Sequence, residues 1–176
     1  GGLGFAGAAS AVVITPVVGN AFNGATQMTA TSAVDFSVTN GGTGHNLIVP
    51  YFTVQDGNMT VIHLTNTDTV NGKAVKVRFR GAQNSDDLLD FQVLMSPGDV
   101  WTAAVTQAAD GAAQLSTADK TCTLPADLKD GKTAKFDTSR LASSVGVAGT
   151  REGYVEIFNM ADIAGDSIFT VNGLAN

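Results

Sequence analysis

Apolar and polar positions alternate through the middle of the chain. Runs rich in β-branched and aromatic residues, separated by short stretches that contain Asp, Asn, Pro and Gly, are typical of β-strands. Two dipeptides, Asp56-Gly57 and Asn71-Gly72, predict hairpin turns, because Gly readily takes the positive φ that such turns need. Consecutive antiparallel strands are therefore predicted over five runs: Leu47–Val54, Met59–Asn66, Ala74–Arg80, Phe91–Met95 and Val100–Val105.

The alternation also predicts the buried face of each strand, because successive side chains of a strand point to opposite sides. In the run 74–80, the odd-numbered residues are apolar and face the core, whereas Lys76, Arg78 and Arg80 face away from it. We expect these basic residues to pair with acidic residues on neighbouring strands. In the run 59–66, the predicted buried set is Thr60, Ile62 and Leu64.

The rest of the chain also shows a pattern of short strands and turns. The stretch 107–150 is polar and rich in turn residues, with one helical turn expected near Thr138–Ser143. We predict an all-β protein, an antiparallel β-sandwich of jelly-roll-like layout, with residues 25–176 as its single domain and residues 1–24 as an apolar extension. The other predicted strands are Thr26–Ala30, Val34–Val38, Ala112–Ser116, Thr121–Thr123, Tyr154–Asn159 and Ser167–Val171.

The N-terminal segment is unusual because residues 1–34 contain no Asp, Glu, Lys or Arg. Its apolar run Ala11–Val18 is too short for a membrane span and contains Pro16, so no membrane-spanning segment is predicted. The run is β-branched, which favours a strand that is buried on both faces. Because Pro16 cannot donate to a ladder, we expect this strand at a sheet edge or as an added strand.

Two alternatives follow for this strand. It either completes the sheet of its own subunit or inserts into a neighbouring subunit through backbone hydrogen bonds. In the second case, apolar side chains of the segment would fill pockets on the neighbour. The candidate donor-strand residues are Leu3, Phe5, Val12, Val13, Ile14, Val17 and Val18.

Charge and composition narrow the function classes. The net charge of −6 argues against a nucleic-acid partner, and only 15% of the residues are charged, which suits an extracellular protein. The sequence begins with Gly1, so we expect that a signal peptide has been removed and that the protein is at the cell surface or extracellular. Cys122 is the single cysteine, which excludes an intrachain disulfide and leaves a buried thiol or an intermolecular partner.

Residues for catalysis or cofactor binding are not apparent. His45 and His63 lack the partners that a metal site or acid–base pair needs, and Asp86, Asp87 and Asp90 lack the spacing of a calcium loop. We therefore predict no enzyme activity, no metal and no cofactor. The aromatic residues Tyr51 and Trp101 are candidates for stacking on a sugar, although Trp101 also suits a core or rim position.

Several motifs occur together in the segments VPYFTVQDGNMTVIHLTNT, KAVKVRFR, SDDLLDFQVLMSPGDVW and TREGYVEIFNMAD. In this order they resemble a family of secreted proteobacterial proteins usually labelled only "cell surface protein". The resemblance covers Val49 to Thr102 and Thr150 to Asp162. It implies an exported β-rich protein and transfers no catalytic residues.

The predicted function is a structural subunit of an extracellular filament or surface assembly. Its N-terminal segment, similar in character to the donor strands of pilus-like filaments, would join subunits head to tail into a homopolymer. The alternative is a secreted carbohydrate- or matrix-binding β-sandwich module with a glycan partner, which would use Tyr51 and Trp101.

Overall fold

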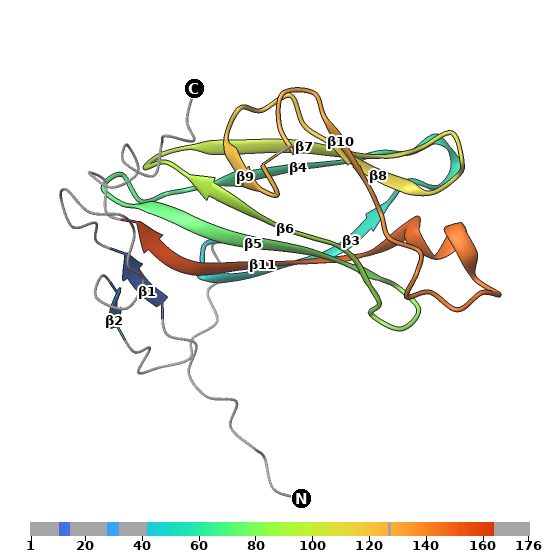
Figure 1. Ribbon diagram of the computed structural model, residues 1–176, viewed down its shortest axis with the longest axis horizontal. Helices are drawn as coiled ribbons and strands as arrows, with labels where there is room; N and C mark the ends of the chain where they lie inside the picture. The colour runs from blue at the N-terminus through green and yellow to red at the C-terminus, as the bar shows by residue number, and fades with distance from the viewer. Residues whose placement is uncertain (1–10, 15–27, 32–41, 127, 164–176) are drawn as a thin grey trace, which may run out of the picture.

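A computed structural model describes residues 11–14, 28–31, 42–126 and 128–163, and these form two β-sheets packed face to face (Figure 1). The predicted β-sandwich is therefore confirmed. The smaller sheet has the order β10 (Thr133–Lys135), β8 (Ala113–Ser116), β7 (Val100–Gln107), β4 (Thr60–Thr65). The larger sheet has the order β2 (Met28–Thr31), β1 (Ala11–Ile14), β11 (Glu152–Ile163), β5 (Gly72–Gly81), β6 (Asp87–Met95), β9 (Cys122–Leu124), with β3 (Asn46–Thr53) also paired to β11.

The chain passes repeatedly between the two sheets. β5 and β6 form a hairpin in the larger sheet, while β4 and β7, which flank them in sequence, pair with each other in the smaller sheet. β3 pairs with the distant β11. This rolled arrangement has the Greek-key connectivity of jelly rolls. It differs from the predicted series of consecutive hairpins, because the β3–β4 and β4–β5 connections both change sheets.

The Asp56-Gly57 turn has the predicted local geometry but not the predicted role. Asp56 and Gly57 have φ values of 54° and 76°, and the N–H of Asn58 donates to the Gln55 carbonyl at 2.9 Å. This tight turn, within η1 (Gln55–Gly57), links β3 in one sheet to β4 in the other. The predicted hairpin is wrong because the turn residues specify a reversal of the chain and not the sheet that the next strand joins.

The Asn71-Gly72 connection also crosses between sheets, so the hairpin predicted there is wrong as well. Its position depends on Asn66, which is buried at the end of β4. The Asn66 side-chain amide donates to the carbonyls of Asn71 at 2.9 Å and Ser96 at 2.8 Å. One buried amide thus holds two neighbouring crossings together, which is how a buried polar group is tolerated in a core.

The core lies between the sheets and follows the predicted alternation. Ile62 and Leu64 are buried and Thr60 is half-buried, whereas Val61 and His63 are exposed. On β5, the odd-numbered residues from 75 to 79 are buried. The largest core side chains meet in edge-to-face and tilted ring contacts, namely Phe52 with Phe79, both of these with Phe136, and Phe91 with Trp101.

The later strands lie close to their predicted positions, with two differences. β10 was not predicted, because Thr133–Lys135 has no apolar alternation, and β11 is longer than the predicted Tyr154–Asn159. The segment 138–143 contains a turn in which Leu141 N donates to the Thr138 carbonyl at 3.1 Å, and a short 3-10 helix, η2 (Gly146–Thr150), follows. The predicted strand Thr26–Ala30 overlaps β2, whereas Val34–Val38 and Ser167–Val171 lie outside the described residues.

Candidate functional site

The predicted donor segment contains a strand that pairs with its own chain. Val12, Val13 and Ile14 lie in β1, parallel to β11 and opposite Ala161, Asp162 and Ile163 respectively. β1 also pairs antiparallel with β2. The other predicted donor residues, Leu3, Phe5, Val17 and Val18, lie outside the described residues.

The expected edge position of this strand is wrong, since β1 lies between β2 and β11. β1 ends at Ile14, before Pro16, so the missing N–H of proline does not interrupt the described ladder. Among the described strand pairings, β1 with β11 is the one parallel pair. Figure 1 shows β1 and β2 beside the C-terminal end of β11, at one end of the sandwich.

The edge of β11 that receives β1 is shared with β3. β3 covers this edge from Glu152 to Phe158, and the Asn159 N–H then donates to the His45 carbonyl at 2.7 Å. β1 covers the same edge from Ala161 to Ile163. The opposite edge of β11 is paired with β5 from Gly153 to Ile163, with one irregularity between Asn159 and Ala161. β1 therefore fills the part of the edge that β3 leaves uncovered.

A β-bulge at Met160 separates these two parts of β11. Asn159 lies opposite Val75 and Ala161 lies opposite Ala74, so Met160 is the additional residue. Before the bulge, Val155 and Ile157 face the core together with Phe79 and Val77. After it, Ala161 is paired with Ala74, which belongs to the other face of β5. The bulge thus turns the odd-numbered side chains of β11 from the core to the outer face.

As a result, a small apolar cluster forms on the outer face of the larger sheet. Its members are Ala74, Ala161 and Ile163, with the half-buried Leu94 packed against them. Ala161 and Ile163 are only 6% and 3% exposed although they face away from the main core. This outer cluster marks the same end of the sheet at which β1 pairs with β11.

Ion pairs hold the inner side of the same strand end. The bulge places Asp162 opposite Lys73, whose Nζ donates to Asp162 Oδ1 at 2.7 Å and to Asp68 Oδ2 at 2.8 Å. Asn159 Nδ2 also donates to Asp162 Oδ1, at 2.9 Å. The Asp162 carboxylate is therefore bound by partners of its own chain, directly beside the residues that pair with β1.

These contacts shift two pKa values in opposite directions. The hydrogen bond from Lys73, with further bonds from the Asn71 and Val70 N–H groups, holds the pKa of Asp68 far below its usual value. Burial acts to lower the pKa of Lys73, but the hydrogen bonds and charges of Asp162 and Asp68 outweigh burial and raise it. Both shifts favour the charged forms of Asp68 and Lys73.

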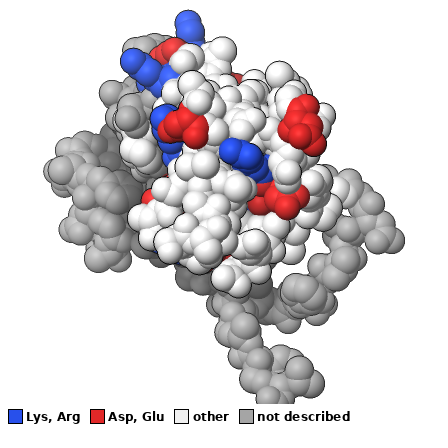
Figure 2. All heavy atoms as spheres, turned by 90° about the vertical axis from the view of Figure 1, so that its right-hand side faces the viewer, with Lys and Arg blue, Asp and Glu red and all other residues white. Residues whose placement is uncertain are grey.

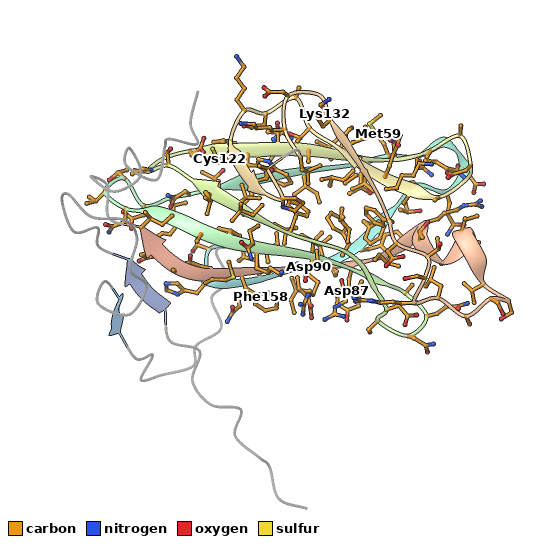
Figure 3. The ribbon with its side chains drawn as sticks, in the orientation of Figure 1. Met59, Asp87, Asp90, Cys122, Lys132 and Phe158 are labelled. Carbon is orange, nitrogen blue, oxygen red and sulfur yellow. The ribbon has the colours of Figure 1, made fainter. Side chains whose placement is uncertain are left out.

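Three basic residues of β5, Lys76, Arg78 and Arg80, form a paired ribbon on the outer face, as predicted. Lys76 and Arg78 both bind Asp90, the latter at 3.0 Å, and Arg80 Nε lies 3.1 Å from Glu156 Oε2. Burial acts to raise the pKa of Asp90, but Lys76 and Arg78 outweigh it and hold the pKa low. Figure 3 shows Asp87, Asp90 and Phe158 on the side of the larger sheet that faces away from the smaller one. This ribbon is a neutralised face and not a site for an anion.

The two aromatic residues predicted to stack on a sugar are not equivalent. Trp101 is fully buried and contacts Phe91, with ring centroids 5.6 Å apart. It is a core residue and presents no ring face to a ligand. Tyr51 is 56% exposed, and its hydroxyl donates to Glu152 Oε2 at 3.1 Å. The structure does not bring the two rings together as a platform.

Other candidate chemistry is sparse. Among the residues that the structure describes, no group of three His, Cys, Asp or Glu side chains could hold a metal ion. Two of the three clustered aspartates lie in β6 and bind basic residues: Asp87 Oδ2 lies 2.9 Å from Arg140 Nη1, and Asp90 binds Lys76 and Arg78. A shallow hollow on the outer face of the smaller sheet is lined by hydroxyls, small apolar groups and the exposed His63. The hollow contains no pair of titratable groups for acid–base catalysis.

The remaining surface observations agree with a low charge density. Figure 2 views the end of the sandwich on the right of Figure 1, where basic and acidic side chains are interspersed on a largely uncharged surface. In the described ranges, no helix has the length and apolar character needed to cross a membrane. Comparison with protein-family models, curated proteins and solved structures finds no match for this chain.

Proposed function

We propose that this protein is a structural subunit of an extracellular filament or surface assembly, in which the N-terminal strand of one subunit completes the larger sheet of the next. The observation that carries the proposal is the manner in which β1 joins the sheet. β1 fills a short open part of the β11 edge beyond β3, through a parallel pairing of three residues. A neighbouring subunit can supply the same backbone groups to the same edge.

The pairing energy supports exchange between subunits. Backbone hydrogen bonds contribute about 0.5–1.5 kcal/mol each, and parallel ladders are slightly less stable per residue than antiparallel ones. A three-residue parallel pairing is thus worth only a few kcal/mol, and it is recovered in full when a neighbour makes it. Each subunit that donates its strand leaves its own edge open for another donor. Such head-to-tail contacts propagate as a fibre unless the rotation closes a ring.

The sequence of the donor segment supports the same conclusion. Residues 1–34 carry no charged side chain, so their transfer into a neighbouring sheet desolvates no charge. The low proportion of charged residues, 15% of the chain, suits close packing of copies. The outer basic ribbon is already neutralised within the subunit. The resemblance to secreted "cell surface protein" sequences fits an assembly on the cell exterior.

Electron microscopy of the purified chain tests this function. We expect fibres with a subunit-sized repeat from the unaltered chain and none after deletion of residues 1–18. A sharper variant is Val13→Pro, which removes one backbone N–H from β1. Val13→Thr is the matched control, because it keeps that N–H and a β-branched side chain. Fibres that persist in both the deletion and Val13→Pro would refute the proposal.

The alternative function, a glycan-binding module, has less support. Of its two candidate stacking residues, Tyr51 is exposed and Trp101 is buried. Isothermal titration calorimetry with oligosaccharides, on the unaltered chain and on Tyr51→Ala, separates the two functions. Saturable binding that Tyr51→Ala abolishes, in a chain that forms no fibres, would favour the glycan-binding module.

A further inference from the structure

We propose that β1 and β2 exchange together, as one hairpin, and that the acceptor on the neighbouring subunit is the Ala161–Ile163 end of its β11, in the parallel register seen within the chain. This inference rests on the proposed function and specifies its donor unit and acceptor site. Four observations support it: the pairing of β1, the open edge of β11, the bulge at Met160 and the length of the connection to β3.

The donor unit follows from the pairing of β1. The antiparallel ladder of β1 and β2 includes all residues of both strands, Ala11–Ile14 and Met28–Thr31. The parallel ladder with β11 includes only Val12–Ile14, and β2 pairs with no other described strand. If β1 moved alone, it would break both ladders. If the hairpin moves as a unit, only the shorter, parallel ladder breaks and re-forms.

The acceptor edge remains structured when the hairpin leaves. Ala161, Asp162 and Ile163 are held on their other edge by Ala74, Lys73 and Gly72 of β5. The ion pair of Asp162 with Lys73 and the hydrogen bond from Asn159 fix the strand end independently of β1. The backbone groups of this edge therefore stay in position for an incoming strand.

The bulge makes the acceptor compatible with a donor that has no charges. By turning the alternation of β11, it puts Ala161 and Ile163 into the outer apolar cluster and Asp162 against Lys73. Without this turn, the period-two pattern would place the Asp162 carboxylate in the outer cluster. The strand end thus has an apolar outer side, and its one carboxylate is already paired with Lys73. It can therefore accept a hairpin segment that has no ionised side chain.

The connection to the sandwich is long enough for exchange. Fourteen residues, 32–45, separate the end of β2 from the start of β3. An extended chain spans at most about 3.3–3.6 Å per residue, so this length reaches up to about 50 Å, comparable with the diameter of a domain of this size. The hairpin can therefore reach the β11 end of an adjacent copy without unfolding its own sandwich.

Disulfide trapping tests the acceptor and its register. Val12 and Ala161 are partners in the parallel ladder, and neighbouring strands lie about 4.7–4.9 Å apart, within the range of Cα separations that a disulfide bridges. The test chain carries Val12→Cys and Ala161→Cys in a Cys122→Ser background, and it is oxidised after assembly. On a denaturing gel without reductant, we expect a ladder of covalent multimers. Val13→Cys with Asp162→Cys provides a second in-register pair if the first does not fold.

A control and a locked hairpin complete the design. Val12→Cys with Glu152→Cys places the second thiol at the far end of β11, where the partner is β3, and should give no ladder. Ala11→Cys with Thr31→Cys, also in the Cys122→Ser background, joins β1 to β2 at paired positions. We expect oxidised chains with this locked hairpin to assemble as well as reduced ones. Assembly that is lost on oxidation and restored by reductant would show that β1 moves alone, and would overturn the inference.

The outcomes separate this inference from the proposed function. Fibres with a covalent ladder support both. Fibres in which the in-register pair forms only within a chain overturn the inference, because the filament would then use another contact. Covalent closed dimers without fibres support the hairpin exchange and refute the filament. Monomers with only the intrachain disulfide overturn both.

Discussion

Gly153 and Gly81 lie directly opposite each other in the β5–β11 ladder, yet we expect very different results when each is replaced by Ala. A Cβ atom on Gly153 would lie 1.8 Å from the Arg80 carbonyl oxygen and 2.9 Å from the Phe52 ring. Such contacts essentially never fall below 3.0 Å, so the two backbones must separate by about 1.2 Å. Gly153 is paired with β3 on its other edge, which prevents β11 from moving away.

The expected cost of Gly153→Ala is about 3 kcal/mol or more, at the upper end for overpacking, because a main-chain ladder between two strands must be displaced. A Cβ on Gly81 would meet the Gly149 carbonyl oxygen at 3.4 Å and the Leu88 methyls at 3.7 Å, which are ordinary contacts. Gly81→Ala should therefore change stability by less than about 1 kcal/mol, since Ala loses less backbone entropy than Gly.

Urea unfolding followed by Trp101 fluorescence measures both variants, because this single Trp is buried in the core and becomes exposed on unfolding. We expect a large fall in the unfolding midpoint for Gly153→Ala and little change for Gly81→Ala, with the same slope for both. Equal midpoints for the two variants would contradict the close approach of β5 and β11 at Gly153.

Three further predictions concern the charges and Trp101. Asp90→Asn should lower the unfolding free energy by about 1 kcal/mol, because Lys76 and Arg78 then lie side by side without their shared carboxylate. Asp110→Asn, at the exposed Asp110–Lys135 pair, should have no measurable effect in the same urea assay. The folded-state pKa values of Asp68 and Asp90 lie below the unfolded value of about 3.9, so stability should be constant above pH 5 and fall as the pH drops through about 4 and below. Urea unfolding midpoints measured from pH 7 to pH 2 would show this fall. A midpoint that does not change with pH would contradict the ion pairs. Trp101 should emit at short wavelength and resist acrylamide quenching, with or without oligosaccharides, and an emission shift on adding sugar would contradict its burial.

The faces of the strands could be predicted from the sequence, because the period of two survives in the folded chain. On β5 the apolar residues Val75, Val77 and Phe79 are buried and the basic residues between them are paired with acids, both as expected. In an alternating strand, successive side chains point to opposite faces, so the polarity of each residue indicates whether it faces the core. This is why the core was predicted more accurately than the topology.

The pairing of the strands could not be predicted in the same way. Asp56-Gly57 forms the expected tight turn, but the following strand joins the other sheet, where β4 pairs with β7. Local residues determine how sharply the chain turns, whereas sheet membership depends on contacts between distant segments. The contribution of Asn66, which ties two crossings through its amide, leaves no pattern in the sequence beyond a polar residue at the end of an apolar strand.

Of the two strands in the proposed exchange, the sequence predicted that residues near 11–18 form a strand but did not predict the edge that this strand joins. The absence of charge in residues 1–34 pointed to a strand that requires cover, and β1 is a strand. The acceptor depends on the bulge at Met160, which the sequence conceals, because Ala161 and Ile163 continue the odd-numbered apolar series of Val155 and Ile157. The one sequence signal of the bulge is Asn159, a polar residue within the odd-numbered apolar series. The side chains change faces immediately after it.

In the proposed assembly a subunit must fold before it donates its strand, and the division of apolar residues between two clusters supports this order. The described members of the main core are supplied by β3 to β11 and their connections, from Phe52 to Ile157, whereas the outer cluster lies apart from that core on the opposite face of the sheet. A stable acceptor requires the main core to be complete within one chain, and an exchangeable donor requires its contacts to be few. The parallel pairing of β1 at the end of β11 satisfies the second requirement, because its loss disturbs three residues of a strand that β5 and Lys73 continue to hold. The described part of the chain thus has a main core whose described members lie outside β1 and a β1–β11 pairing of only three residues, a combination that the proposed head-to-tail assembly needs.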